Sequence, residues 1–456
     1  MAIATGSVVR SQQMSNAEIV RLNKEYTLFE WNAQAAFNPI PVDHAKGVYF
    51  WDPEGKRYID FNSQLMSVNI GHGDERVIRA IQEQAAQLPY VSPYHATRVR
   101  GLLGEMLAEI TPGRLKKSFF TLGGAEANEN AIKIARTVTG KHKILARYRS
   151  YHGGTAGAMT LTGDPRRWPA EPGIPGVVHM HDPYRYRCRW CAKEPACTLD
   201  CLNHVEDTIQ FEGPDKIAAI IMEPVTGTNG IIIPADGYLQ GVRELCDRYG
   251  ILFIADEVMS GFGRTGEWFA VNHWNVEPDI MSVAKGLTSS YLPLGATIVS
   301  EEIAHYFDER VLYAGLTYGG HAMGCAAAIA CINVYQEDHL IENARAMGKI
   351  LAEEEDRLKE KHPSVGEVRH IGLFSIFELV RNRRTKEPMA PFNAKGSEMG
   401  PMALVAKFFR DNGLFTFVRW NNFFANPPLC VNEAELREGF DIIDRALEIT
   451  DDSVVE

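Results

Sequence analysis

Lys285 and Asp256 are the two residues whose types and positions most directly indicate chemistry. Lys285 follows the apolar run IMSVA and precedes Gly286, and Asp256 ends the apolar run ILFIA. A lysine amine can form an imine with an aldehyde cofactor, and a buried acid can pair with the nitrogen of a pyridinium ring. Either residue alone is more often an ordinary surface charge. Together they predict a site for pyridoxal phosphate (PLP).

A glycine pair upstream predicts a place for the phosphate group. The segment 117–122, KSFFTL, has the composition of a strand, and 125–140 has the apolar spacing of a helix. Gly123 and Gly124 lie between them. The N–H groups at a helix start have no partners within the helix and lie at the positive end of its dipole. We therefore expect Gly123, Gly124 and Ala125 to hold a phosphate through backbone amides.

The elements that must position these residues alternate between strands and helices. Segments 216–224 and 250–258 are short apolar runs that contain an acid near their end, which is typical of strands buried in a parallel sheet. The helical spacing of 237–250 between them completes a βαβ unit. Ligands of open α/β sheets bind beyond the carboxyl ends of the strands, where Glu223 and Asp256 are expected.

Composition excludes several classes of function. The chain has 456 residues, of which 45% are hydrophobic and 23% charged, and its net charge is -11. Its basic residues are dispersed, so a nucleic-acid partner is not expected. No run of apolar residues has the length of a signal peptide core or a membrane span. We expect a cytoplasmic enzyme without a membrane partner.

Four of the eight cysteines crowd into one segment. Cys188, Cys191, Cys197 and Cys201 stand close to His204, with a spacing that resembles a zinc knuckle. The loops between them are shorter than those of well-characterised zinc modules. We therefore expect no metal here, and either a disulfide or free thiols instead.

The chain resembles a known family through a series of motifs. In order they are GVYFWDPEGKRYIDF, FFTLGGAEANENAIKIAR, YHGGT, IMEPV, ADEVMSGFGRTG, SVAKG and LTYGGHAMGCAAA, over roughly residues 15 to 450. This set is similar to the class III aminotransferases of PLP fold type I. The resemblance implies an α/β fold, with a mainly parallel seven-stranded sheet in a large PLP-binding domain at 66–330. It also implies a smaller α+β domain from 14–65 and 331–456, after a disordered tail at 1–13.

The resemblance also assigns roles around the cofactor. Lys285 carries PLP and moves the proton, and Asp256 keeps the ring nitrogen protonated. Val258 packs on one ring face and Tyr151 on the other, with His152 beside it. The family's hydroxyl residues in the phosphate loop are replaced here by Gly123 and Ala125, so backbone amides must carry more of the binding.

Two further residues are assigned by the same resemblance. Glu223 is similar to an acid that hydrogen-bonds near the ring or pairs with a substrate arginine, although it can also simply accept bonds from backbone amides. Thr317 in LTYGG resembles a threonine that reaches the phosphate in the neighbouring subunit, which implies a homodimer.

The substrate pocket is predicted from the C-terminal part and from scattered aromatic residues. Arg419 in FTFVRW is the candidate that binds the acceptor carboxylate. The remaining candidates for the pocket are Trp31, Met66, Tyr90, Tyr94 and Trp420. Each of these side chains is alternatively part of the core.

The sequence therefore predicts a PLP-dependent aminotransferase with a ping-pong mechanism. Its donor is an omega-amino acid or primary amine, such as beta-alanine, taurine or an arylalkyl amine, and its acceptor is pyruvate or a similar 2-oxo acid. An aminomutase or decarboxylase on the same fold is the alternative within enzymes. A non-catalytic dimeric interaction protein that uses the cysteine-rich loop is the alternative from another class.

Overall fold

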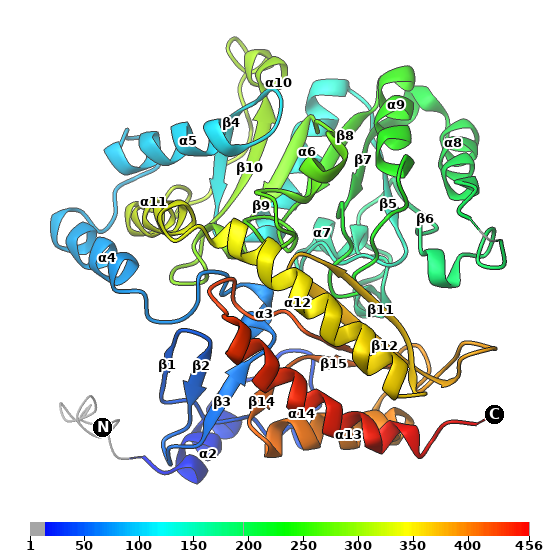
Figure 1. Ribbon diagram of the computed structural model, residues 1–456. Helices are drawn as coiled ribbons and strands as arrows, with labels where there is room; N and C mark the ends of the chain where they lie inside the picture. Colours follow the sequence, from blue (N-terminus) through cyan, green and yellow to red (C-terminus); the bar gives the residue numbers. More distant parts are fainter. Residues whose placement is uncertain (1–13, 195, 456) are drawn as a thin grey trace.

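The computed structural model describes residues 14–194 and 196–455, and the tail predicted at 1–13 lies outside this part. The strands form one large sheet, which helices flank, and two smaller sheets that lie below it in Figure 1. Within the described ranges, no helix combines the length and apolar character needed to cross a membrane.

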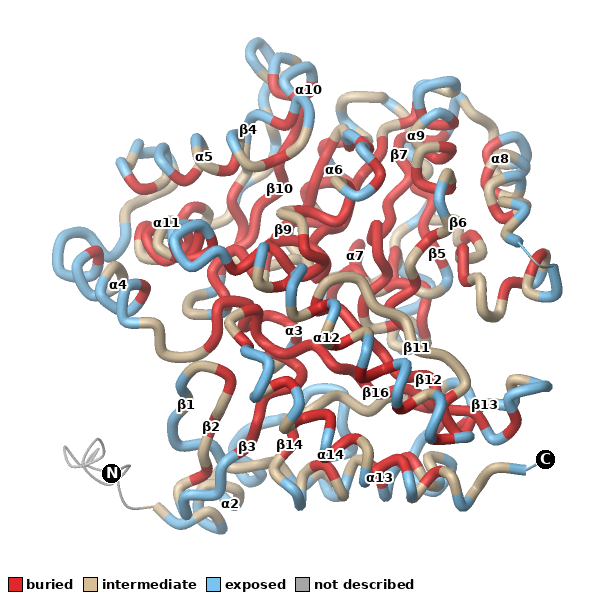
Figure 2. Tube along the Cα trace, viewed as in Figure 1, coloured by how far each residue is buried: buried red, intermediate tan, exposed pale blue. Residues whose placement is uncertain are grey.

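The large sheet has seven strands and is mainly parallel, as predicted. Only β10 runs antiparallel to its neighbours β4 and β9. All six residues of β7 are buried, because helices cover both faces of the sheet (Figure 2). In spatial order the strands are β4 (Leu115–Thr121), β10 (Gly295–Ser300), β9 (Ile280–Val283), β8 (Leu252–Asp256), β7 (Ile217–Met222), β5 (Lys143–Arg147) and β6 (Val177–Met180).

The helices predicted at 125–140 and 237–250 are present as α6 (Gly124–Thr139) and α9 (Tyr238–Tyr249). Gly250 ends α9 in a left-handed conformation, φ 60°, which glycine adopts without strain. The other helices of this half are α4 (Glu75–Gln87), α5 (Arg98–Ile110), α7 (Ala156–Leu161), α8 (Asp200–Glu212), α10 (Glu301–Tyr306) and α11 (Ala322–Glu337).

The two smaller sheets combine segments from both ends of the chain. β14 pairs in parallel with β3, so residues near 414 lie beside residues near 59. One sheet contains β1 (His44–Lys46), β2 (Tyr49–Trp51), β3 (Arg57–Asp60) and β14 (Leu414–Phe415). The other contains β11 (Val365–Ile371), β12 (Phe374–Asn382), β16 (Asn422–Phe424) and β15 (Val418–Arg419), with β13 (Glu387–Pro388) paired to β12. The domain boundaries at 65/66 and 330/331 stay predictions.

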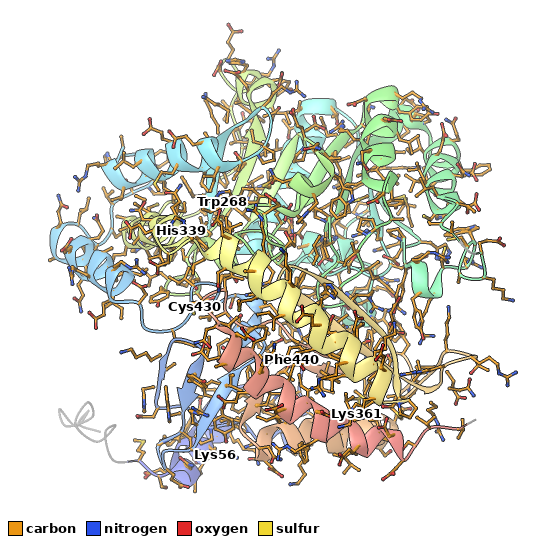
Figure 3. All side chains as sticks on the ribbon, viewed as in Figure 1. Lys56, Trp268, His339, Lys361, Cys430 and Phe440 are labelled. Carbon is orange, nitrogen blue, oxygen red and sulfur yellow. The ribbon has the colours of Figure 1, made fainter. Side chains whose placement is uncertain are left out.

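Helices complete this half of the molecule. Phe440 on α14 lies edge-on to Phe61, with ring centroids 5.9 Å apart, and Lys361 at the end of α12 forms an ion pair with Asp444 on α14 (Figure 3). The helices are α2 (Asn16–Tyr26), α3 (Ser63–Met66), α12 (Leu340–Lys361), α13 (Pro401–Asp411) and α14 (Glu433–Asp451). Short 3₁₀ turns occur at Pro165–Ala170, Arg185–Arg187, Pro214–Lys216, Ala270–Trp274, Lys285–Leu287 and Gly396–Met399.

A buried arginine fixes the segment that joins the two halves. The Arg264 guanidinium donates to Ser63 Oγ at 2.9 Å, to Asn69 Oδ1 at 3.1 Å and to the carbonyl of Pro427 at 2.6 Å. Ser63 and Met66 adopt left-handed backbone conformations, with φ 46° and 54°, which cost energy for residues other than glycine. Arg264 therefore holds a strained turn whose Met66 side chain faces the site described next.

Candidate active site

A cavity of about 410 Å³ lies at the carboxyl ends of the parallel strands. Residues that follow β4, β5, β7, β8 and β9 line it, because parallel strands end at the same edge of the sheet. Nine of the predicted cofactor residues contribute to its wall: Gly123, Gly124, Ala125, Tyr151, His152, Glu223, Asp256, Val258 and Lys285. Trp31 and Met66 from the predicted substrate set line it as well.

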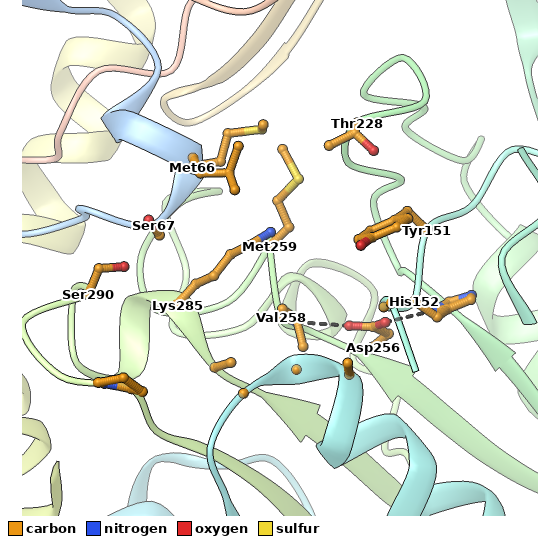
Figure 4. A pocket seen from close by; sticks show the side chains of 18 of the residues that line it. Met66, Ser67, Tyr151, His152, Thr228, Asp256, Val258, Met259, Lys285 and Ser290 are labelled. Carbon is orange, nitrogen blue, oxygen red and sulfur yellow. Dashed lines mark hydrogen bonds and ion pairs between the residues drawn. The ribbon is translucent and has the colours of Figure 1, made fainter. Parts of the chain in front are cut away.

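Lys285 begins a 3₁₀ turn directly after β9, and its side chain reaches into the cavity (Figure 4). The residue after it must be small, because a Cβ on Gly286 would meet Asn69 Nδ2 at 2.6 Å and Phe262 Cβ at 2.7 Å. Burial lowers the pKa of Lys285, although the carboxylates of Asp256 and Glu223 act in the opposite direction. The lowered pKa increases the fraction of neutral amine, which is the form that accepts a proton.

Asp256 is held in one orientation by three donors. Its Oδ2 lies 2.7 Å from His152 Nδ1 and 2.7 Å from Asn128 Nδ2, and its Oδ1 accepts from the backbone N–H of Val258 at 3.1 Å. A carboxylate accepts about four hydrogen bonds, so it retains capacity for one more donor. Sequence reasoning missed Asn128, although its position on α6, just after the glycine pair, places it beside the site.

Glu223 follows β7 and accepts two backbone hydrogen bonds. Its Oε1 accepts from the N–H of Tyr151 at 3.1 Å, and its Oε2 accepts from the N–H of Gly227 at 2.7 Å. Burial raises the pKa of Glu223, while the nearby His152 opposes this shift. The residue thus ties the loop after β5 to the loop after β7 at the cavity wall.

The glycine pair forms the start of α6. Gly123 is the N-cap residue and has an extended backbone. A Cβ added to it would meet no atom within 4 Å. A Cβ on Gly124 would instead meet Val258 Cγ1 at 2.7 Å. The N–H groups of the first helical turn therefore face a space that small residues keep open, as a phosphate requires.

Arg166 is a cavity residue that sequence reasoning missed. Its guanidinium lies 3.7 Å from the ring centroid of Tyr151 and 5.7 Å from that of Trp31. It donates to Asp164 Oδ2 at 2.6 Å and to Thr228 Oγ1 at 2.8 Å. The only sequence signal is the basic pair in DPRRW, which does not by itself distinguish a site residue from a solvated turn.

Arg419 lies beside this group but is not part of the cavity wall. Its Nη2 is 3.1 Å from Asp164 Oδ2, its Nη1 donates to the carbonyl of Thr228 at 3.2 Å, and its guanidinium stacks over Trp420 at 4.1 Å. Burial, and next the charge of Arg166, lower the pKa of Arg419 to about 10. Burial alone would raise the pKa of Asp164, yet its hydrogen bonds with Arg166 and the charge of Arg419 lower it to about 2.

The structure places Thr317, Tyr90 and Tyr94 away from the cavity that Lys285 lines. They line a second cavity of about 700 Å³, where the Tyr90 hydroxyl donates to the carbonyl of Thr317 at 2.9 Å. Tyr94 is 98% exposed. Within one chain these residues do not meet Lys285, so their assigned roles stay predictions that require a second subunit.

The cavity as a whole fits PLP. Lys285 supplies the amine, Asp256 has acceptor capacity for a ring N–H, and the start of α6 offers amides for the phosphate. Val258 and Tyr151 stand on the wall between these groups, and one face of Tyr151 is already covered by Arg166. A flat ring between Tyr151 and Val258 would use the face of Tyr151 opposite Arg166.

Comparisons with known proteins agree with this chemistry. The sequence model described as "Aminotransferase class-III" matches residues 31–447. The chain belongs to this family. A taurine:2-oxoglutarate aminotransferase from Bifidobacterium kashiwanohense, solved with PLP and glutamate, is 40% identical, with a TM-score of 0.92 over 97% of this chain and 100% of that chain.

Curated relatives include proteins named for two different reactions. The taurine–pyruvate aminotransferase of Bilophila wadsworthia is 34% identical over 94% of this chain and 97% of its own length. A leucine/methionine racemase of Thermococcus litoralis is 35% identical over 92% of this chain and 93% of its own length. This class-III aminotransferase is a PLP-dependent enzyme that transfers amino groups from amines to 2-oxo acids. The fold type predicted from the sequence is confirmed.

Proposed function

We propose that the donor of this aminotransferase carries an acid group distant from its amine, as omega-amino acids and taurine do. The observation that carries the proposal is the guanidinium of Arg166 in the cavity wall, backed by Arg419. The Nε and Nη2 groups of Arg166 already donate to Asp164 and Thr228, so its Nη1 group remains to donate to a carboxylate or sulfonate. The acceptor is pyruvate or a similar 2-oxo acid.

The charges of this group suit one anion at a time. Arg166 and Arg419 carry two positive charges, and the Asp164 carboxylate between them neutralises one. The remaining positive charge matches a single acid group on the substrate. In a ping-pong reaction the donor and the acceptor occupy the site in turn, so one such receptor serves both.

The other residues have distinct tasks in this proposal. Bound PLP supplies an electron-accepting ring. The neutral amine of Lys285 accepts the proton from the substrate carbon. It then donates this proton to the cofactor carbon that takes over the amino group. Asp256, oriented by His152 and Asn128, holds the proton on the ring nitrogen. Tyr151 and Val258 keep the ring plane in place.

We also propose a homodimer in the cytoplasm. Tyr94, which lines one cavity with Thr317, is 98% exposed, and Tyr313 and Tyr318, close to Thr317 in the sequence, are 84% and 54% exposed. Such a patch on a single chain favours an interface. The eight cysteines are all free thiols in the structure, which suits a reducing compartment.

Replacing Arg166 with Gln tests the proposed donor class. We expect the Michaelis constant for taurine or beta-alanine to rise about tenfold to a hundredfold, from the loss of one charged hydrogen-bonded contact. The rate with 1-phenylethylamine, which has no acid group, should change little. Because donor and acceptor use one receptor, the Michaelis constant for pyruvate should rise as well, and Arg419→Gln, which alters the residue behind the cavity wall, should have the smaller effect on both. Equal losses with both donors would show that Arg166 is structural and contradict the proposal.

A further inference from the structure

The cysteine-rich insertion between β6 and α8 holds two thiols close together. The Sγ atoms of Cys191 and Cys197 lie 3.7 Å apart. Cys191 is 1% exposed, whereas Cys197 is partly exposed. From this arrangement we propose that Cys191 and Cys197 are a redox-modification site, at which a reversible disulfide forms.

The geometry of the loop favours closure of this bond. A disulfide has a sulfur–sulfur distance of about 2.0 Å, so the two sulfurs must approach by roughly 1.7 Å for the bond to form. Arg185 restrains the backbone on one side, because its guanidinium donates to the carbonyls of Cys191 and Glu194. The insertion therefore already holds the two thiols near each other before they react.

The two other cysteines of the cluster, one in the insertion and one at the start of α8, are poorer partners. Cys188 and Cys201 are buried like Cys191, so burial does not rank them, but neither belongs to the close sulfur pair. Burial, and next the neighbouring thiols, raise the pKa of Cys201 to about 12, so this thiol stays protonated. Because thiolates rather than thiols attack disulfides, Cys201 does not compete for the bond.

The reaction is a thiol–disulfide exchange with a small-molecule disulfide such as oxidised glutathione. The Cys197 thiolate attacks one sulfur of the oxidant, forms a mixed disulfide and releases one small thiolate. The Cys191 thiolate then attacks Cys197 Sγ and releases the second. Cys191 and Cys197 together lose two electrons and two protons, and the oxidant becomes two thiols. An excess of small thiol reverses both steps.

A shared zinc ion is the competing explanation for four clustered cysteines. In the described part of the chain, no group of three or more His, Cys, Asp or Glu side chains is arranged to hold a metal ion. The sulfurs of Cys191 and Cys197 are instead in near contact as a pair. The arrangement therefore favours a pair of reacting thiols over a tetrahedral thiolate site.

The test uses the PLP-loaded enzyme, equilibrated with defined ratios of reduced to oxidised glutathione. Intact mass should fall by about 2 Da on oxidation and recover with excess reduced glutathione. Peptide mapping without reductant should show one linked peptide that joins Cys191 to Cys197. Cys191→Ser and Cys197→Ser should abolish the intramolecular link, while the control Cys246→Ser, in buried α9, should retain it.

Three results would overturn the proposal. They are a link that maps to Cys188 or Cys201, no loss of mass under oxidising glutathione, and one zinc per chain that is released only when all four thiols are titrated. The first two measurements are made on the unaltered chain, so they do not depend on whether a variant folds. Transamination activity serves only to show that the enzyme is intact.

Discussion

At the scale of single residues, the site depends on how firmly Asp256 is held. Two side-chain donors, His152 and Asn128, fix one of its oxygens at 2.7 Å each. This arrangement keeps a negative charge at one place in a buried site. Because Asp256 is 2% exposed, water does little to screen that charge from a ring nitrogen.

Asp256→Asn should leave PLP bound but slow the reaction of bound PLP with an amine by at least about a hundredfold. The neutral amide no longer holds a proton on the ring nitrogen, so the ring accepts electrons less readily. Stopped-flow absorbance measures this step directly. Asp247→Asn, an exposed acid on α9, is the matched control and should react at the unaltered rate. A near-normal rate for Asp256→Asn would remove this residue from the chemistry.

The sequence predicted the residues that form short motifs beside strand ends. Lys285, Asp256, Gly124 and Tyr151 belong to this class, and they all line one cavity. Arg166 was missed because its role depends on a turn at 165–170 that brings a common surface residue over Tyr151. Residues that meet only through tertiary structure leave no local pattern in one sequence.

Among the elements of the site, the start of α6 leaves very different amounts of space for a side chain at two neighbouring positions. A side chain at Gly123 meets nothing within 4 Å, whereas one at Gly124 meets Val258. Gly123 is also the N-cap of α6, where serine is favoured because its hydroxyl accepts a helical N–H. The space at the start of α6 therefore requires a glycine at 124 but not at 123.

Gly123→Ser should be tolerated and should bind PLP at least as tightly as the unaltered chain, because it adds a hydroxyl beside the phosphate position. Gly124→Ala should weaken PLP binding about tenfold or more, because its methyl group displaces Val258 from the ring face. Equilibrium dialysis of PLP measures both affinities. If the two variants behaved alike, the cradle would lie elsewhere.

The sequence largely predicts which segments form helices or strands. It does not predict which of these segments pack or pair with one another. Apolar runs gave β7 and β8, and helical spacing gave α6 and α9, because these periods follow directly from backbone geometry. The pairing of β14 with β3 joins segments far apart in the chain, and β14 is too short to carry a pattern. Likewise, only the structure shows Arg264 holding the strained turn at 63–66.

At the scale of the whole molecule, the proposed homodimer has a direct consequence for Thr317. Light scattering should give the molar mass of a dimer for the unaltered chain and for Thr317→Ala. The PLP affinity of Thr317→Ala should fall about threefold to tenfold, because a phosphate hydrogen bond is lost. Thr385→Ala, at an exposed position between β12 and β13, is the control and should bind PLP normally. A fully active monomer would contradict the shared site.

The enzyme should transfer amino groups in two separate half-reactions. With an amine alone, the absorbance of bound PLP should disappear in a single turnover, and added pyruvate or 2-oxoglutarate should restore it while producing the corresponding amino acid. Lys285→Ala should do neither at a measurable rate, because it lacks the group that moves the proton. A racemase, mutase or decarboxylase instead turns over its substrate repeatedly without a 2-oxo acid. Sustained turnover without an acceptor, or no bleaching by any amine, would contradict a ping-pong transfer of amino groups.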